Sequence, residues 1–148
     1  MSSQQRRHRW LAAALVATGV AVPACARAQG ELPAADEAAV VEPVEGTDLA
    51  SVTLTGEAAR RLGIVTAPVR TGAGTGTIIP FAAVLYDASG HTWAYTQTGE
   101  LTYVRAAITV DRVDGDLAYL GRGPAVGTPV VTVGVAELFG AEYGVGGE

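Results

Sequence analysis

Residues 103–111, Tyr-Val-Arg-Ala-Ala-Ile-Thr-Val-Asp, carry the clearest secondary-structure signal in the chain. Their side chains alternate with a period of two, with Val104, Ala106, Ile108 and Val110 on one face and Tyr103, Arg105, Thr109 and Asp111 on the other. Such alternation predicts a β-strand with one apolar face. Asp114 and Gly115 follow, and glycine accepts the positive φ of a tight hairpin turn. A returning strand is therefore expected over residues 117–120.

The segments around this strand continue the β pattern. Further strands are predicted at residues 52–54, 64–69, 78–86, 92–96 and 130–135, separated by turns at 87–90 and 98–100 and a loop at 121–127. One short helix is expected over residues 57–62, because Thr55 can cap its start and Gly63 can end it. Residues 51–142 are therefore predicted to form an all-β domain, a small β-barrel or β-roll of about six to seven strands with one short helix.

Length and composition exclude several classes of protein. The chain has 148 residues, of which 49% are hydrophobic, and a formal net charge of −5. This length fits one domain with appendages and is too short for a two-domain enzyme or a multi-span transporter. The negative charge offers no basic surface for nucleic acid. The single cysteine cannot form an internal disulfide or a cysteine-based metal cluster.

The N-terminus has the features of an export signal. Several arginines precede an apolar stretch over residues 10–24, which is shorter than the ~20 residues that a membrane-spanning helix needs. Cys25 follows in a sequence that resembles a bacterial lipobox, although Pro23 departs from the usual pattern. Residues 1–24 are therefore predicted to be a lipoprotein-type signal peptide, and Cys25 the lipid anchor. Ordinary cleavage after Ala28 is the alternative.

The segments that flank the domain are expected to lack regular structure. Residues 25–50 are rich in alanine, proline and acids, which predicts a flexible acidic tether. Residues 143–148 are expected to be a disordered tail. Together with the signal, this organisation predicts an exported, extracytoplasmic protein held on the lipid bilayer through its N-terminal lipid.

Four segments resemble the membrane-proximal domain of one family of proteins. Residues 80–84, with Gly90 and residues 92–95, are similar to the "P-x-x-A-V … G … V-[FY]-V" pattern of periplasmic adaptor subunits, the membrane fusion proteins of resistance–nodulation–division (RND) efflux pumps. Residues 103–110 resemble the family's next strand. Residues 127–134, with Leu138, resemble the closing part of the domain, and residues 54–64 resemble its opening part.

The resemblance implies a function and also shows a departure from the family. In the family, the lipoyl domain, the helical hairpin and the barrel stand between the opening segment and the remainder of the domain, whereas here only residues 70–77 do. The resemblance implies a non-enzymatic module that docks on the extracytoplasmic face of an inner-membrane transporter. Without the hairpin, this chain would not by itself reach an outer-membrane channel.

Three patterns that can indicate a chemical site have simpler structural interpretations. The glycine-rich residues 71–77 lack the lysine and the following helix of a phosphate-binding loop, so a flexible connector is expected. Asp111, Asp114 and Asp116 do not have the spacing of a calcium loop, and no metal site is predicted. His91 stands alone beside a turn and is expected to face solvent. We therefore predict no cofactor and no enzymatic activity.

The aromatic residues are the remaining candidates for a binding site. Trp93 and Tyr95 are predicted to face a partner or ligand, and Tyr86 and Tyr103 can join them in stacking on sugar rings. Packing in the core or across neighbouring strands is the commoner role of such residues. The alternative function is therefore a stand-alone cell-envelope module for glycan or a small ligand, and a truncated adaptor without an independent role is a third interpretation.

Overall fold

The computed structural model of the protein describes residues 38–74 and 76–144. The predicted signal peptide, Cys25, residues 25–37 of the tether and residues 145–148 lie outside the described residues. The described part is mostly β-sheet with two α-helices, which confirms the all-β class. The strands are β1 (Ala39–Pro43), β2 (Ala50–Leu54), β3 (Val65–Pro68), β4 (Arg70–Thr71), β5 (Thr77–Pro80), β6 (Leu85–Tyr86), β7 (Thr92–Gly99), β8 (Thr102–Ala107), β9 (Thr109–Asp114), β10 (Leu117–Arg122) and β11 (Pro129–Val133).

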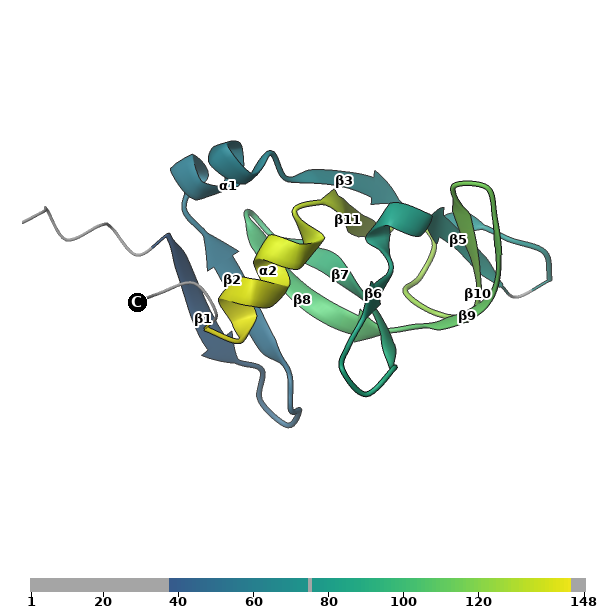
Figure 1. The fold of residues 1–148 in the computed structure, drawn as a ribbon, viewed down its shortest axis with the longest axis horizontal. Helices are drawn as coiled ribbons and strands as arrows, with labels where there is room; N and C mark the ends of the chain where they lie inside the picture. Colours follow the sequence, from purple (N-terminus) through teal and green to yellow (C-terminus); the bar gives the residue numbers. More distant parts are fainter. Residues whose placement is uncertain (1–37, 75, 145–148) are drawn as a thin grey trace, which may run out of the picture. The chain divides into compact units, whose positions relative to one another are not determined.

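The strands form two antiparallel sheets (Figure 1). The seven-stranded sheet has the order β1-β2-β8-β7-β11-β3, and β6 pairs with the first residues of β7. The four-stranded sheet has the order β4-β5-β10-β9. Within the described residues neither sheet closes on itself, so the predicted barrel is wrong and the number of strands exceeds the expected six to seven. Several additional strands are short and lack an apolar period of their own.

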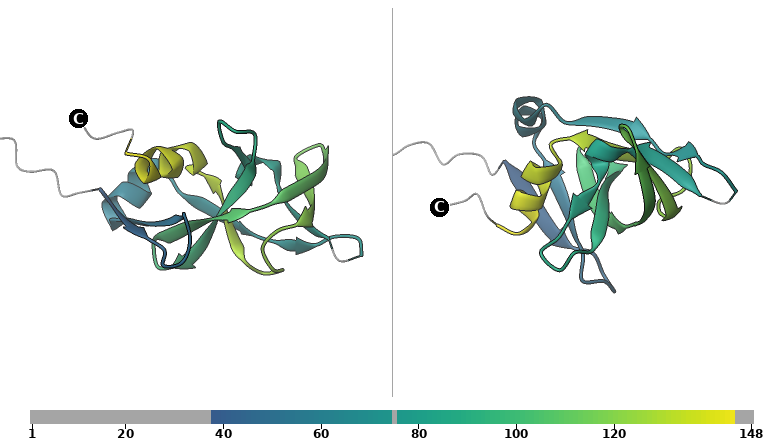
Figure 2. Two further views of the ribbon diagram at one scale, coloured as in Figure 1. Left: turned by 90° about the horizontal axis from the view of Figure 1, so that it is seen from below. Right: turned by 45° about the vertical axis from the view of Figure 1, so that its right-hand side comes forward.

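A single long strand was expected over residues 103–111, and the structure divides it at Ile108. β8 belongs to the first sheet and β9 to the second, so the chain crosses between the sheets at this residue (Figure 2). Ile108 stays bonded to the start of β7, because its N–H donates to the Thr92 carbonyl and its own carbonyl accepts from Thr92 Oγ1 at 2.7 Å. The side chains of β8 alternate as expected, but the more buried face is the opposite one. Tyr103 and Arg105, assigned to the polar face, are buried, whereas Val104 and Ala106 are only partly buried.

Strand β7 contributes to two hydrophobic clusters. Tyr95 and Val131 belong to the first cluster, which lies among β2, β8, α1 (Gly56–Leu62) and α2 (Val135–Glu142). Ala94 and Val130 belong to the second cluster, which joins β7 and β11 to the four-stranded sheet. Consecutive strand residues point to opposite faces of a sheet. β7 and β11 are therefore covered on both faces and link the two halves of the core.

The tether prediction is wrong over its last part. Residues 39–43 form β1 and pair with β2 in register from Ala39–Leu54 to Pro43–Ala50. Val40 and Val41 are 47% and 41% exposed, so β1 buries little apolar surface. The backbone hydrogen bonds offered by β2 hold this strand in place. Hydrophobic patterning does not detect such a strand.

Both ends of α1 agree with the sequence prediction. Thr55 Oγ1 accepts from the Ala58 N–H at 3.2 Å, and Gly63 ends the helix with φ 62°. The hairpin turn at Asp114–Gly115 is also confirmed, with φ 56° at Gly115.

The C-terminal segment differs from the prediction. β11 ends at Val133, Gly134 takes φ 92°, and the chain turns into α2, a second helix that was not expected. Tyr143, assigned to the disordered tail, follows α2 directly, and its N–H donates to the Phe139 carbonyl at 3.2 Å. Its ring also packs 4.7 Å from that of Phe139. The domain therefore extends past residue 142 because Tyr143 completes the last turn of α2.

Gly134 is expected to be essential for the entry into α2. A Cβ atom at this position would lie 2.1 Å from Ile64 Cδ1, on a backbone with φ +92°. Gly127 has almost the same φ, +89°, but an added Cβ would have nothing within 4 Å. We expect Gly127→Ala to lower the free energy of unfolding by about 1–2 kcal/mol from backbone strain alone. Gly134→Ala should cost about 0.5–1.5 kcal/mol more, because Ile64 Cδ1, at the end of its side chain, must turn away from the new methyl.

Urea denaturation of the two variants measures this difference. Ile64→Val removes Cδ1, so combining it with Gly134→Ala should recover part of the additional loss. Equal losses for the two alanine variants would contradict the contact with Ile64.

Candidate functional site

A pocket of about 500 Å³ lies where the β6–β7 hairpin meets the crossing between the two sheets. Its walls come from β6, the following turn, the first residues of β7, the crossing, β9 and the end of β10. The side chains that give it chemical character are Tyr86, His91, Trp93, Ile108, Val110 and Arg122. Its volume falls within the ~300–1,000 Å³ typical of small-molecule sites.

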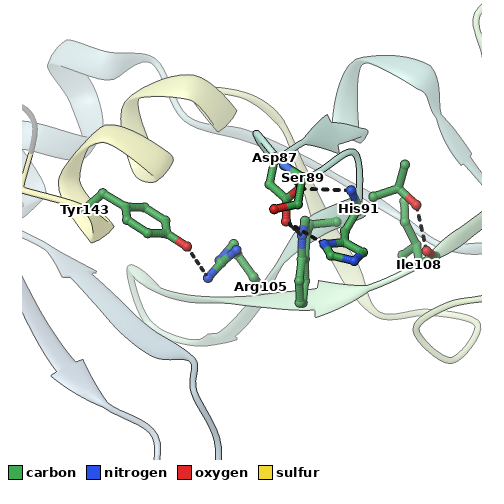
Figure 3. Close-up of polar contacts among 8 residues, drawn as sticks. Asp87, Ser89, His91, Arg105, Ile108 and Tyr143 are labelled. Carbon is green, nitrogen blue, oxygen red and sulfur yellow. Dashed lines mark hydrogen bonds and ion pairs between the residues drawn. The ribbon is translucent and has the colours of Figure 1, made fainter.

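Asp87 organises the turn at the edge of this pocket (Figure 3). Its Oδ1 accepts from the N–H groups of Ser89 and His91 at 2.8 and 2.9 Å. Its Oδ2 accepts from the Trp93 indole N–H at 3.0 Å and lies 3.2 Å from His91 Nδ1. The pKa of Asp87 is lowered to about 2, and the hydrogen bond from Trp93 is the largest cause. Burial acts in the opposite direction and raises the pKa, but it is outweighed. An ionised carboxylate thus holds both Trp93 and His91 at the pocket.

Arg105 fixes Trp93 from a second direction. The guanidinium carbon lies 4.7 Å from the centroid of the Trp93 ring, a distance typical of a cation–π contact. It also lies 5.3 Å and 5.9 Å from the rings of Tyr143 and Phe139. The guanidinium is therefore surrounded by aromatic side chains from β7 and from the end of α2.

Arg105 forms a buried ion pair with Glu142. The two side chains are 5% and 4% exposed, and Arg105 Nε lies 2.8–2.9 Å from the two carboxylate oxygens. Tyr95 donates its hydroxyl to Glu142 Oε2 at 2.5 Å, and Arg105 Nη2 donates to the Tyr143 hydroxyl at 3.0 Å. Burial disfavours the charged form of Arg105, but the hydrogen bond and the charge of Glu142 outweigh it and raise its pKa. Burial, with Glu142 in support, also raises the pKa of Tyr95.

No sequence pattern indicates this ion pair. The alternation of residues 103–111 puts Arg105 on a polar strand face, and nothing in the sequence singles out Glu142. The two residues lie 37 positions apart, and no spacing pattern connects a strand residue with a helix end at that distance. The only available signal was the presence of an arginine beside Tyr103 in the most regular strand of the chain.

The structure separates the two aromatic candidates. Trp93 lines the pocket, as a ligand-facing residue must. Tyr95 is 0% exposed and its hydroxyl is bound by Glu142, so its assignment to a ligand-facing surface is wrong. Trp93 and Tyr95 are two residues apart in β7 and share one face of the strand. Tyr95 is buried there because its hydroxyl meets Glu142 at the end of α2. Tyr86, at 55% exposed, lies with Trp93 at the pocket, whereas Tyr103 is buried in the first cluster.

The other sequence candidates are structural elements. Thr71 and Thr77 pair across β4 and β5, so the glycine-rich stretch begins and ends in two paired strands. His91 is 71% exposed, as expected, and its ring is bound to Asp87. In residues 38–74 and 76–144, no three acidic, histidine or cysteine side chains gather where they could hold a metal ion. No helix in these ranges is long and apolar enough to cross a membrane.

Comparison of the chain with protein-family models, with curated proteins and with solved structures finds no match.

Removing one partner of the buried ion pair is expected to destabilise the fold strongly. Arg105→Met leaves the Glu142 carboxylate buried without its counter-charge, and Glu142→Leu does the same to the guanidinium. Each should lower the free energy of unfolding by about 3–5 kcal/mol. The double variant should lose less than the sum of the two, because neither charge remains. Urea denaturation measures all three variants.

The exposed pair Arg112–Asp114 supplies a matched control. Its atoms are 3.4 Å apart and its side chains are 56% and 71% exposed. Arg112→Met should therefore cost no more than about 1 kcal/mol. Strictly additive losses at Arg105 and Glu142 would contradict a coupled pair.

Asp87 is expected to make the fold sensitive to acid. Its pKa falls from 3.8 to about 2 on folding, so its stabilising effect is complete above pH 3.8 and is lost as the pH falls towards 2. The melting temperature of Asp87→Asn should therefore lie below that of the wild type at pH 6, and the gap should narrow below pH 3.8. In Trp93→Phe, carboxyl NMR should show the pKa of Asp87 moving back towards 3.8. A gap that stays constant down to pH 2 would be incompatible with this assignment.

Proposed function

We propose that the chain is a non-enzymatic, extracytoplasmic adaptor-like module that docks on a membrane efflux transporter, RND-like or of another type, through protein–protein contact. The observation that carries the proposal is that the strand after the opening segment pairs with a strand of the closing segment. β3 follows the first segment and pairs with β11 of the second, from Pro68–Pro129 to Val65–Val133. β3 and β11 therefore pair although only residues 70–77 stand where the family has further domains.

The carboxylates of Asp87 and Glu142 have structural partners, which favours a binding role over catalysis. The Asp87 carboxylate accepts from two backbone N–H groups and from Trp93. Glu142 is neutralised by Arg105 and also binds Tyr95. These groups hold the fold together, and their hydrogen-bonding capacity is largely used within it.

The edge strand β1 is the surface we propose for docking. Its outer edge has no neighbouring strand among the described residues, and its exposed side chains include Val40 and Val41. An unpaired apolar edge is a template for a strand of another protein. The other outer strands are β3, β4 and β9. β3 and β4 are shorter than β1, with four and two residues. β9 carries three charged residues, Asp111, Arg112 and Asp114, where β1 carries only Glu42, and charged edge residues discourage pairing.

The predicted lipid anchor would restrict this edge to the neighbourhood of the membrane. Ala39 follows Cys25 by 14 positions. A chain of that length spans at most about 50 Å, however it is arranged. Confinement of this kind raises the effective concentration of a membrane partner to the order of mM. A lipid at Cys25 would therefore strengthen docking without any additional contact.

The alternative is a stand-alone cell-envelope module for glycan or a small ligand. It loses Tyr95, which is buried, and keeps Trp93 at the pocket. Binding of a small ligand in this pocket would be a property of the domain in addition to docking.

Site-specific photo-crosslinking in cells tests the docking proposal. A photoreactive phenylalanine at position 40 or 41 is expected to capture an inner-membrane transporter, because both positions lie on the free edge strand. Position 113 is the matched control, since Val113 is 45% exposed but lies on the charged edge. Cys25→Ser should reduce the captured amount by removing the predicted membrane confinement. Capture of no membrane transporter at position 40 or 41 would contradict the proposal.

A further inference from the structure

The pocket contains a rigid aromatic platform. Trp93 is held at its indole N–H by Asp87 and on its ring by Arg105, and Arg105 is itself fixed by the buried Glu142. A side chain fixed in this way loses little conformational entropy when a ligand binds. Tyr86 also lines the pocket and is 55% exposed. The pocket therefore offers two aromatic surfaces, one of them held in place before binding.

The pocket lining also carries a positive charge. Arg122, at the end of β10, is exposed and forms no ion pair with any of the described residues. The residues that line the pocket include no aspartate or glutamate. Asp87 is engaged by Trp93 and His91, and Asp111 lies against Gly121 outside the lining. An anionic group in the pocket would thus meet a guanidinium that no acid of the lining neutralises.

We propose that this pocket binds a small carboxylate-bearing ligand with a flat ring, the ring lying on Trp93 and the carboxylate on Arg122. A planar guanidinium matches a carboxylate by two parallel hydrogen bonds. The volume of about 500 Å³ suits a ligand of one or two rings. The site is separate from the edge strand β1 and does not depend on docking to a transporter, so either proposal can fail without the other.

Selective ¹⁵N labelling of tryptophan in the processed protein gives a direct test. The chain has two tryptophans, and Trp10 lies in the predicted signal peptide, so the processed protein gives the indole signal of Trp93 alone. Benzoate serves as the probe that combines a ring with a charge. Benzyl alcohol has the ring without the charge, and acetate has the charge without the ring. Benzoate is expected to shift the Trp93 signal saturably in the millimolar range, as fits a ligand of its size.

Matched arginine variants test the proposed role of the guanidinium. Arg122→Gln should weaken benzoate binding about tenfold, the loss expected for a charge-assisted contact, and should leave benzyl alcohol unchanged. Arg112→Gln removes the same charge from the adjacent strand, outside the pocket lining, and should leave benzoate binding unchanged. Because Arg122 is exposed and unpaired among the described residues, its variant is expected to fold normally.

Three results would overturn the proposal. The first is an unchanged Trp93 signal up to about 50 mM benzoate, beyond the range expected for a ligand of this size. The second is equal affinity for benzoate and benzyl alcohol, which would leave no role for charge. The third is equal benzoate affinity in Arg122→Gln and the wild type. None of these results bears on crosslinking at β1, which tests docking independently.

Discussion

The ion pair between Arg105 and Glu142 is the interaction on which the arrangement of this domain depends. It joins the middle of β8 to the last turn of α2, and both side chains are almost completely buried. Replacing such a pair with apolar residues often costs little, so its net contribution to stability is small compared with its geometric effect. A guanidinium and a carboxylate must meet in one orientation. This requirement sets the position of α2 over the sheet more narrowly than the apolar contacts of Leu138 can.

The same arginine connects the core to the pocket. One side of the guanidinium faces Glu142 and Tyr143, and another lies against the Trp93 ring. Trp93 in turn reaches Asp87, which closes the turn before β7. A continuous series of contacts therefore runs from the C-terminal helix to the pocket edge. Side chains of the core hold the pocket residue Trp93 in place through these contacts, and a connected network of this kind makes the pocket more rigid than a loop alone would.

Sequence patterns identified the elements whose signal is local. The cap at Thr55 and the turn at Gly115 depend on residues within a few positions, and both are present in the structure. β1 escaped prediction because a partner strand holds it and its own side chains stay exposed. The Arg105–Glu142 pair escaped for a related reason, since a contact between distant segments leaves no periodic trace. Trp93 and Tyr95 were both candidates because aromatic side chains can stack on a ligand ring, but the burial of Tyr95 depends on the packing of α2, which no local pattern predicts.

The arrangement of the two sheets explains how one small domain can carry two separate surfaces. β7 and β11 take part in both hydrophobic clusters, so the second sheet is attached to the first through a buried centre. This leaves β1 free as an outer edge of the first sheet and creates the pocket where the chain crosses at Ile108. Docking at β1 would use backbone groups and exposed valines, whereas the pocket uses a fixed ring and a charge. Because the two surfaces share no residue, a ligand could alter docking only by binding unequally to two states of the core that connects them.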